Sequence, residues 1–163
     1  MLFRSVDAAP GTTVTEAFAY DLRGNLVSRV DGNGNATTCT FDALGRKLTE
    51  KAPDPDGVGP LPAPVTAFAY DTSGNLVATT FGDGRVARTA YDRRQREVKR
   101  TAPDGTFALV AYDPAGNKAS ETDALGRVTR FVYDARNRGV ATLLPDGSTT
   151  RSRYDGEIGR AHV

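Results

Sequence analysis

The sequence predicts an all-β protein: a repetitive antiparallel β-meander of short hairpins that forms a single curved or spiralling sheet. Three observations support this fold. An aromatic residue followed by Asp recurs at intervals of 21, 29, 21, 21, 21 and 21 residues, and all six tyrosines of the chain lie in these pairs. Each interval contains two turn signals rich in Gly, Asp, Asn and Pro. The segments between the turns are rich in Thr, Val, Phe and Tyr, which favour strands.

Composition argues against a compact core. Leu, Ile, Val and Phe account for 33 of the 163 residues, about 20%, which is the level at which globular folds give way to extended or disordered chains. Disorder is disfavoured because the net charge is only +1 and the strand-forming residues are evenly spread. A sheet that grows by repetition fits this composition better than a domain with a buried interior.

The first turn of each unit follows the aromatic residue. The pairs are Tyr20 and Asp21, Phe41 and Asp42, Tyr70 and Asp71, Tyr91 and Asp92, Tyr112 and Asp113, Tyr133 and Asp134, and Tyr154 and Asp155. Gly follows three residues after Asp at Gly24, Gly45, Gly74 and Gly116, which is the preference of a type I turn. Asn137 takes the place of Gly in one unit and tolerates the same left-handed backbone, whereas Gln95 does not fit well. We therefore predict that Gln95 marks a strained or differently shaped turn.

A second turn lies about ten residues further on, at 31–34, 83–84, 103–105, 123–126 and 145–147. The spacing predicts strands over 25–30 and 36–41, 75–80 and 85–91, and 117–122 and 127–133. Short turns force neighbouring strands to pair antiparallel. Pro-Asp precedes the second turn only in alternate units, which suggests a double unit of 42 residues. The single longer interval contains a Pro-rich loop insertion at 53–64.

Alternation along a strand places each tyrosine on the same face as the residue two positions before it, as in Phe68 and Tyr70 or Phe131 and Tyr133. We expect the repeat to stack Tyr above Tyr as an aromatic ladder. Arg29, Arg88 and Arg130 interrupt the other face, so neither face can bury itself as a sandwich would.

The two ends differ from the repeats. Residues 1–5 and 157–163 both resemble translations of short-read sequencing adapters, so we expect an adapter-derived or non-native leader at 1–5 and an adapter-derived tail at 157–163. The YD-repeat array would then occupy 6–156, as an internal fragment of a longer protein. The only histidine, His162, falls in the expected tail.

The motif Tyr-Asp-x-x-Gly-Asn-Leu-Val at 20–27 and 70–77, with Asp-Ala-Leu-Gly-Arg at 42–46 and 123–127, closely resembles the RHS/YD-repeat family. The resemblance covers Val14 to Asp155. Members include bacterial Rhs polymorphic toxins, cocoon-forming subunits of Tc toxins, wall-associated proteins and teneurins. The resemblance implies a structural shell segment that encapsulates a C-terminal toxin or effector domain not present in this chain. An alternative is a cell-surface adhesion or carbohydrate- or polyanion-binding array.

No enzyme, cofactor or metal site is predicted. The repeated aspartates lack the nine-residue period of calcium-binding β-rolls, so turn capping explains them better. The self-cleaving aspartate machinery of the family cannot be carried over to any residue. Cys39 is the only cysteine and reads as a small packed side chain, and Asp54 and Asp56 read as part of a solvated loop.

A basic stretch is the one candidate contact. Polyanion binding is possible at Arg85, Arg88, Arg93, Arg94 and Arg96, against the simpler reading of a solubilising face. Expected partners are adjacent repeats of the same chain, with an encapsulated toxin domain or cell-surface carbohydrate as further possibilities. We expect no nucleic acid and no membrane span. The parent protein would be secreted or exposed at the cell surface.

Overall fold

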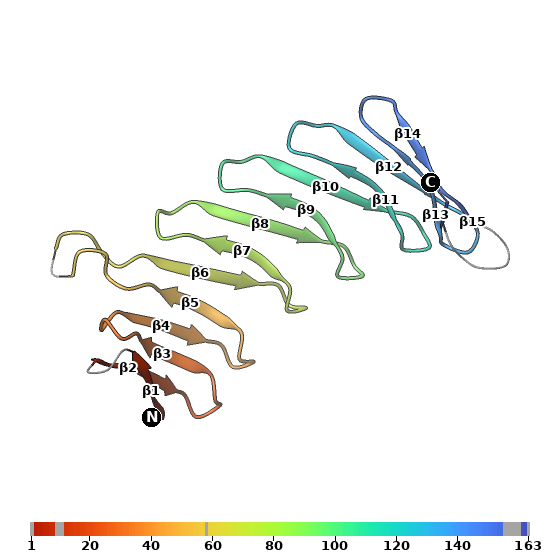
Figure 1. Ribbon diagram of the computed structural model, residues 1–163. Coiled ribbons are helices and arrows are strands. Elements are labelled where there is room, and N and C mark those ends of the chain that lie inside the picture. The colour runs from red at the N-terminus through yellow and green to blue at the C-terminus, as the bar shows by residue number, and fades with distance from the viewer. Residues whose placement is uncertain (1, 9–11, 58, 155–160, 163) are drawn as a thin grey trace. The chain divides into compact units, whose positions relative to one another are not determined.

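The computed structural model describes residues 2–8, 12–57, 59–154 and 161–162, and side chains within 16–57 and 59–154 (Figure 1). Every regular element in these ranges is a β-strand, so the predicted all-β class is confirmed. The chain divides into two compact units, Met1–Val86 and Ala87–Val163. In each unit the strands follow one another in chain order, and those whose pairing is described are antiparallel.

The first unit is a meander from β1 to β7. Its strands are β1 Leu2–Ala8, β2 Thr12–Tyr20, β3 Leu26–Val30, β4 Ala36–Phe41, β5 Lys47–Lys51, β6 Val65–Tyr70 and β7 Leu76–Thr80. Strand β1 pairs with β2 from Leu2 to Ala8, and the non-native leader expected at 1–5 stays a prediction.

The second unit repeats the same plan. Its strands are β8 Val86–Tyr91, β9 Glu97–Thr101, β10 Phe107–Tyr112, β11 Lys118–Thr122, β12 Val128–Tyr133, β13 Gly139–Leu143 and β14 Thr149–Arg151, followed by a separate pair of β15 Arg153–Tyr154 and β16 Ala161–His162. Each of the six strands predicted from the turn spacing is present with ends that agree to within one residue.

One turn geometry serves both edges of the meander. After β2, the Gly24 amide donates to the carbonyl of Asp21 at 3.1 Å and the Asp21 amide donates to Asn25 at 3.0 Å. Gly24 has φ +84°, so the hairpin is a type I turn closed by a left-handed residue. The second turn after β3 shows the same two bonds, from Gly34 to Asp31 and from Asp31 to Asn35.

Gln95 occupies the left-handed position with φ 61°, and Asn137 does so with φ 59°. The turn around Gln95 keeps both hydrogen bonds, since the Asp92 amide donates to Arg96 at 2.9 Å and the Gln95 amide donates to Asp92 at 3.0 Å. The predicted backbone strain at Gln95 is therefore present, and the alternative of a different turn shape is wrong. The hydrogen bonds hold the chain in a conformation that its side chain disfavours.

The Pro-rich insertion replaces one second turn. The Ala52 amide still donates to the Pro64 carbonyl at 2.9 Å, so the hairpin closes as it does elsewhere and the intervening residues loop out. In the described part of residues 53–64 there is no strand, as predicted.

None of the side chains whose exposure is described is fully buried. The less exposed strand residues are only half-buried, as expected for a single layer with no second sheet against it. Stability must then come from contacts between neighbouring strands, and these contacts form the candidate site.

Candidate functional site

Each Tyr-Asp turn is organised by the aspartate carboxylate. Oδ1 of Asp21 accepts the amides of Arg23 and Asn25, both at 2.9 Å, and Oδ2 accepts the Asn25 side-chain amide at 2.8 Å. Hydrogen bonds from the Asn25 side chain and backbone lower the pKa of Asp21, because they stabilise the ionised carboxylate. Turn capping was the predicted role of these aspartates.

The residue four positions after Asp alternates between two types. It is Asn after Asp21, Asp71 and Asp113, and Arg after Asp42, Asp92 and Asp134. The Arg units are the same units that carry Pro-Asp in the sequence. The structure therefore supports the double unit of 42 residues.

In the Arg units the guanidinium has two partners. It pairs with its own Asp, as in Arg96 Nη2 to Asp92 Oδ2 at 2.6 Å, and it stacks on the tyrosine of the next unit. The guanidinium carbon lies 4.0 Å from the ring centroid for Arg96 on Tyr112. The same contact spans 4.7 Å for Arg46 on Tyr70 and 4.4 Å for Arg138 on Tyr154. These are cation–π distances.

The tyrosine hydroxyl completes the connection by donating to a backbone carbonyl of an earlier strand. Tyr70 donates to Lys47 at 2.9 Å, and Tyr112 donates to Glu97 at 3.2 Å. Tyr133 donates to Lys118 at 3.0 Å and Tyr154 to Gly139 at 3.1 Å. We call the set of Asp, Arg and next-unit Tyr the interlock, exemplified by Asp92, Arg96 and Tyr112.

The interlock differs from the aromatic ladder that the sequence suggested. At Tyr70, Tyr112 and Tyr154 the group over the ring is a guanidinium. The arginines were missed as repeat residues. The sequence carries a signal for them, because Asn and Arg alternate at the fourth position after each aspartate from Asp21 to Asp134.

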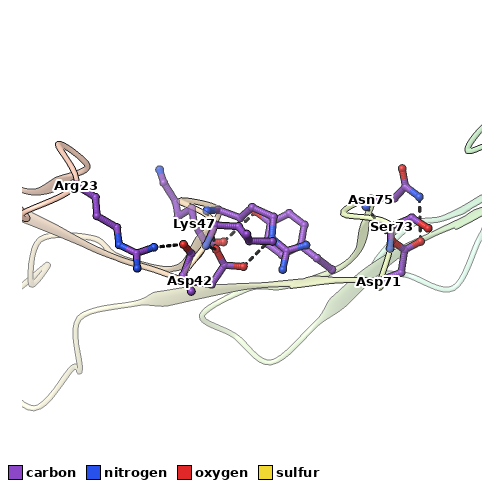
Figure 2. A network of polar contacts seen from close by, with 10 residues as sticks. Arg23, Asp42, Lys47, Asp71, Ser73 and Asn75 are labelled. Atoms are coloured by element: carbon purple, nitrogen blue, oxygen red, sulfur yellow. Dashed lines mark hydrogen bonds and ion pairs between the residues drawn. The ribbon is translucent and has the colours of Figure 1, made fainter.

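A second set of contacts joins successive Tyr-Asp turns. Arg23 Nη1 donates to the carbonyl of Ala43 in the next turn, and Figure 2 shows Arg23 reaching toward the turn that begins at Asp42. In the second unit, Asn117 Nδ2 donates to Asn137 Oδ1 at 3.0 Å. These hairpins are thus tied to their neighbours both through their strands and through their turns.

The predicted repeat residues from Tyr20 to Tyr154 occupy the positions described above, and Asp155 lies outside the described residues. Phe41 has no hydroxyl and cannot make the carbonyl contact. Cys39 is half-buried on the same face as Phe41. Within the described ranges, no group of His, Cys, Asp and Glu is placed to hold a metal ion.

The five predicted polyanion contacts do not form one surface. Arg85 pairs with Asp83 at 2.6 Å, and Arg96 belongs to the interlock. Arg93 and Arg94 lie in the turn beyond the far end of β8, and a six-residue strand separates its ends by roughly 20 Å. Arg88 lies within the strand and is exposed. Polyanion binding by these residues stays a prediction.

In the described part of the chain, no helix is long and apolar enough to cross a membrane.

Comparison with protein families gives one match. The sequence model described as RHS Repeat matches residues 20–58, 70–106 and 112–149. Each matched segment begins at the tyrosine of an Asn unit and continues through the following Arg unit. The match thus follows the double unit that the contacts define. A search of curated proteins finds no relative of this chain.

Solved structures share the fold. A TcdB2–TccC3 structure without its hypervariable C-terminal region matches with TM-score 0.66 at 17% identity, over 90% of this chain and 9% of that one. The Tc holotoxin pore of Photorhabdus luminescens matches with TM-score 0.68 at 16% identity, over 91% of this chain and 9% of that one. A TcdB2–TccC3–TEV structure matches with TM-score 0.64 at 19% identity, over 94% and 9%. This chain therefore spans about a tenth of these proteins.

Proposed function

The chain belongs to the RHS-repeat family, and on that premise we propose that it is a wall segment of a β-shell that encloses a C-terminal toxin or effector domain located elsewhere in a longer parent protein. The role of the repeats is structural. The observation that carries the proposal is the interlock, which ties each Arg unit to the Asn unit that follows it, in a sheet without a buried core among its described residues. A wall made of one layer can extend without limit and leave space behind it.

The structural neighbours support the same role. One neighbour is a TcdB2–TccC3 protein lacking its hypervariable C-terminal region and another is a Tc holotoxin pore, and this chain matches only 9% of each. The partners of the segment would be adjacent repeats and an enclosed domain, and the parent would be secreted. We assign no catalytic step to this segment, because the repeated Asp, Arg and Tyr groups are engaged with one another.

Limited proteolysis of the full-length parent protein tests enclosure. The C-terminal domain should resist cleavage in the intact protein and be cut quickly once separated from the repeats. Substituting Arg96→Ala and Arg138→Ala should raise the cleavage rate of that domain by loosening the wall. Arg93→Ala and Arg136→Ala remove the same charge from exposed turn positions and serve as the control. Equal cleavage of the C-terminal domain with and without the intact repeats would refute enclosure.

A further inference from the structure

Strand register assigns the side chains of the second unit to two faces. Arg88 and Phe107 both pair with Thr101, and Lys99 pairs with Leu109, so these side chains share one face. The pairing of Leu109 with Thr122 carries this face into β11, and the register of β12 to β14 continues it. There the face includes Arg130, Val132, Leu143 and Arg151. We call this the basic face, and its charged and exposed large apolar members are Arg88, Lys99, Phe107, Leu109, Arg130, Val132, Leu143 and Arg151.

The basic face carries only positive charge. Strands β8 to β14 contain two acidic residues, Glu97 and Glu121, and register places both on the opposite face with the tyrosines. There they are already paired, Glu97 with Arg100 at 2.8 Å and Glu121 with Lys118 at 3.1 Å. The four cations of the basic face are exposed. Within residues 59–154 none of them has an ion-pair partner.

Apolar side chains lie between these cations. Phe107 is 45% exposed, Val132 44%, and Leu109 and Leu143 37% each. Two grooves adjoin at Leu143. One, of about 390 Å³, is lined by Val132, Leu143 and Arg151, and the other, of about 480 Å³, by Val128, Arg130 and Leu143 among others. In these adjoining grooves the arginines can form ion pairs with an extended polypeptide, and the apolar side chains can exclude water from it.

We propose that the basic face binds an extended acidic polypeptide segment that also carries apolar side chains. Its carboxylates pair with Arg130 and Arg151, and its apolar side chains enter the grooves beside Leu143. The assignment of this segment to the enclosed domain rests on the proposed shell function. Charge complementarity alone would admit a nucleic acid, but that partner uses rows of aromatic rings for stacking, and Phe107 is the single aromatic residue on this face within the described strands.

Fluorescence anisotropy on the 163-residue chain tests the proposal. The probe is a labelled flexible peptide in which glutamate and leucine are separated by glycine and serine. It should bind, weaken as salt rises, and bind far less when its glutamates are replaced by glutamine. The double variant Arg130→Gln and Arg151→Gln should weaken binding about fivefold, as expected for two exposed ion pairs.

Matched controls separate this surface from net charge. Arg93→Gln with Arg136→Gln removes the same charge at exposed turns and should change the affinity by less than about twofold. Leu143→Ser should weaken binding, whereas Leu125→Ser, at an exposed turn outside the face, should not. Circular dichroism checks that every variant keeps its strands.

Two results would overturn the proposal: equal loss of affinity in the face and turn variants, or oligothymidine binding more tightly than the acidic peptide. Neither depends on the proteolysis of the parent protein. Peptide binding without protection of the C-terminal domain would preserve the binding surface and reject the shell. Protection without peptide binding would preserve the shell and reject the acidic partner.

Discussion

Single carboxylates set the local geometry of this molecule. In a Tyr-Asp turn the aspartate accepts backbone amides two and four residues later, and its second oxygen accepts the side chain at the fourth position, as at Asp92 and Arg96. Charged acceptors make stronger hydrogen bonds than neutral ones. The same arrangement recurs at Asp21, Asp71 and Asp134, so one small motif specifies the hairpins at regular intervals along the chain.

The turn at Gln95 should gain stability from glycine. Gln95→Gly removes the side chain from a backbone with φ 61° and should raise the free energy of unfolding by about 1 kcal/mol. Asn137→Gly is the comparison at φ 59° and should gain less, since Asn tolerates this conformation and its side chain accepts a hydrogen bond from Asn117. Urea unfolding measures both. An equal or larger gain at Asn137 would contradict the strain assigned to Gln95.

Acid should destabilise the array. The pKa values of Asp21, Asp92 and Asp113 are lowered chiefly by side-chain hydrogen bonds, and those of Asp42 and Asp134 chiefly by backbone ones. A carboxyl whose folded pKa is depressed stabilises the fold above its unfolded pKa, and this contribution is lost as pH falls through the folded pKa. Tm should therefore stay level down to about pH 5 and fall steadily below about pH 4. An unchanged Tm at pH 3 would contradict this role.

At the scale of the element, the unit of structure is a hairpin joined to its neighbour. The guanidinium of Arg96 connects the turn that begins at Asp92 to Tyr112 at the end of β10, and the Tyr112 hydroxyl connects back to β9. A register shift of one residue precedes the final aromatic residue of β2, β4, β6, β8, β10 and β12. The carbonyls that accept tyrosine hydroxyls belong to residues opposite such shifted aromatics, namely Lys47, Glu97, Lys118 and Gly139.

Replacing the stacked arginine with lysine tests the planar contact. Arg96→Lys keeps the positive charge but loses the flat guanidinium over Tyr112, so it should cost about 1 kcal/mol of stability. Arg93→Lys at the exposed part of the same turn should cost less than about 0.5 kcal/mol. Equal losses measured by urea unfolding would show that charge alone matters at the fourth position.

Strand positions could be predicted because local turn chemistry determines them. The Asp-x-x-Gly turns before β3 and β11 define where each strand starts, to within one residue. The interlock was not predicted, because it joins Arg96 to Tyr112 across strands whose register no local pattern specifies. The basic face was missed for a related reason. Its cations, Arg88, Lys99, Arg130 and Arg151, lie on four strands and form a group only once the register is known.

At the scale of the whole molecule, the absence of fully buried side chains within the described ranges makes stability a sum of neighbour contacts. A chain of this kind has no centre whose loss unfolds everything at once. Its exposed apolar residues, Phe107 and Val132 among them, face solvent in the isolated polypeptide. Both properties suit a segment that other parts of a larger protein would cover.

The isolated chain should associate in solution. Strand β14 is the last strand of the described sheet and leaves one backbone edge unpaired, which is a template for pairing with another copy. Light scattering should show mass rising with concentration, together with a concentration-dependent melt. A sharp, concentration-independent transition of a monomer would contradict this expectation.

The interlock, and not a hydrophobic core, holds each Arg unit to the hairpin that follows it. A double-mutant cycle between Arg96→Ala and Tyr112→Leu measures this coupling, with unfolding followed in urea at the lowest workable concentration. The two substitutions should be coupled by about 1 kcal/mol, the size of a desolvated cation–π contact. Arg93→Ala with Tyr112→Leu should show no coupling. Additive losses for Arg96 and Tyr112 would contradict the claim.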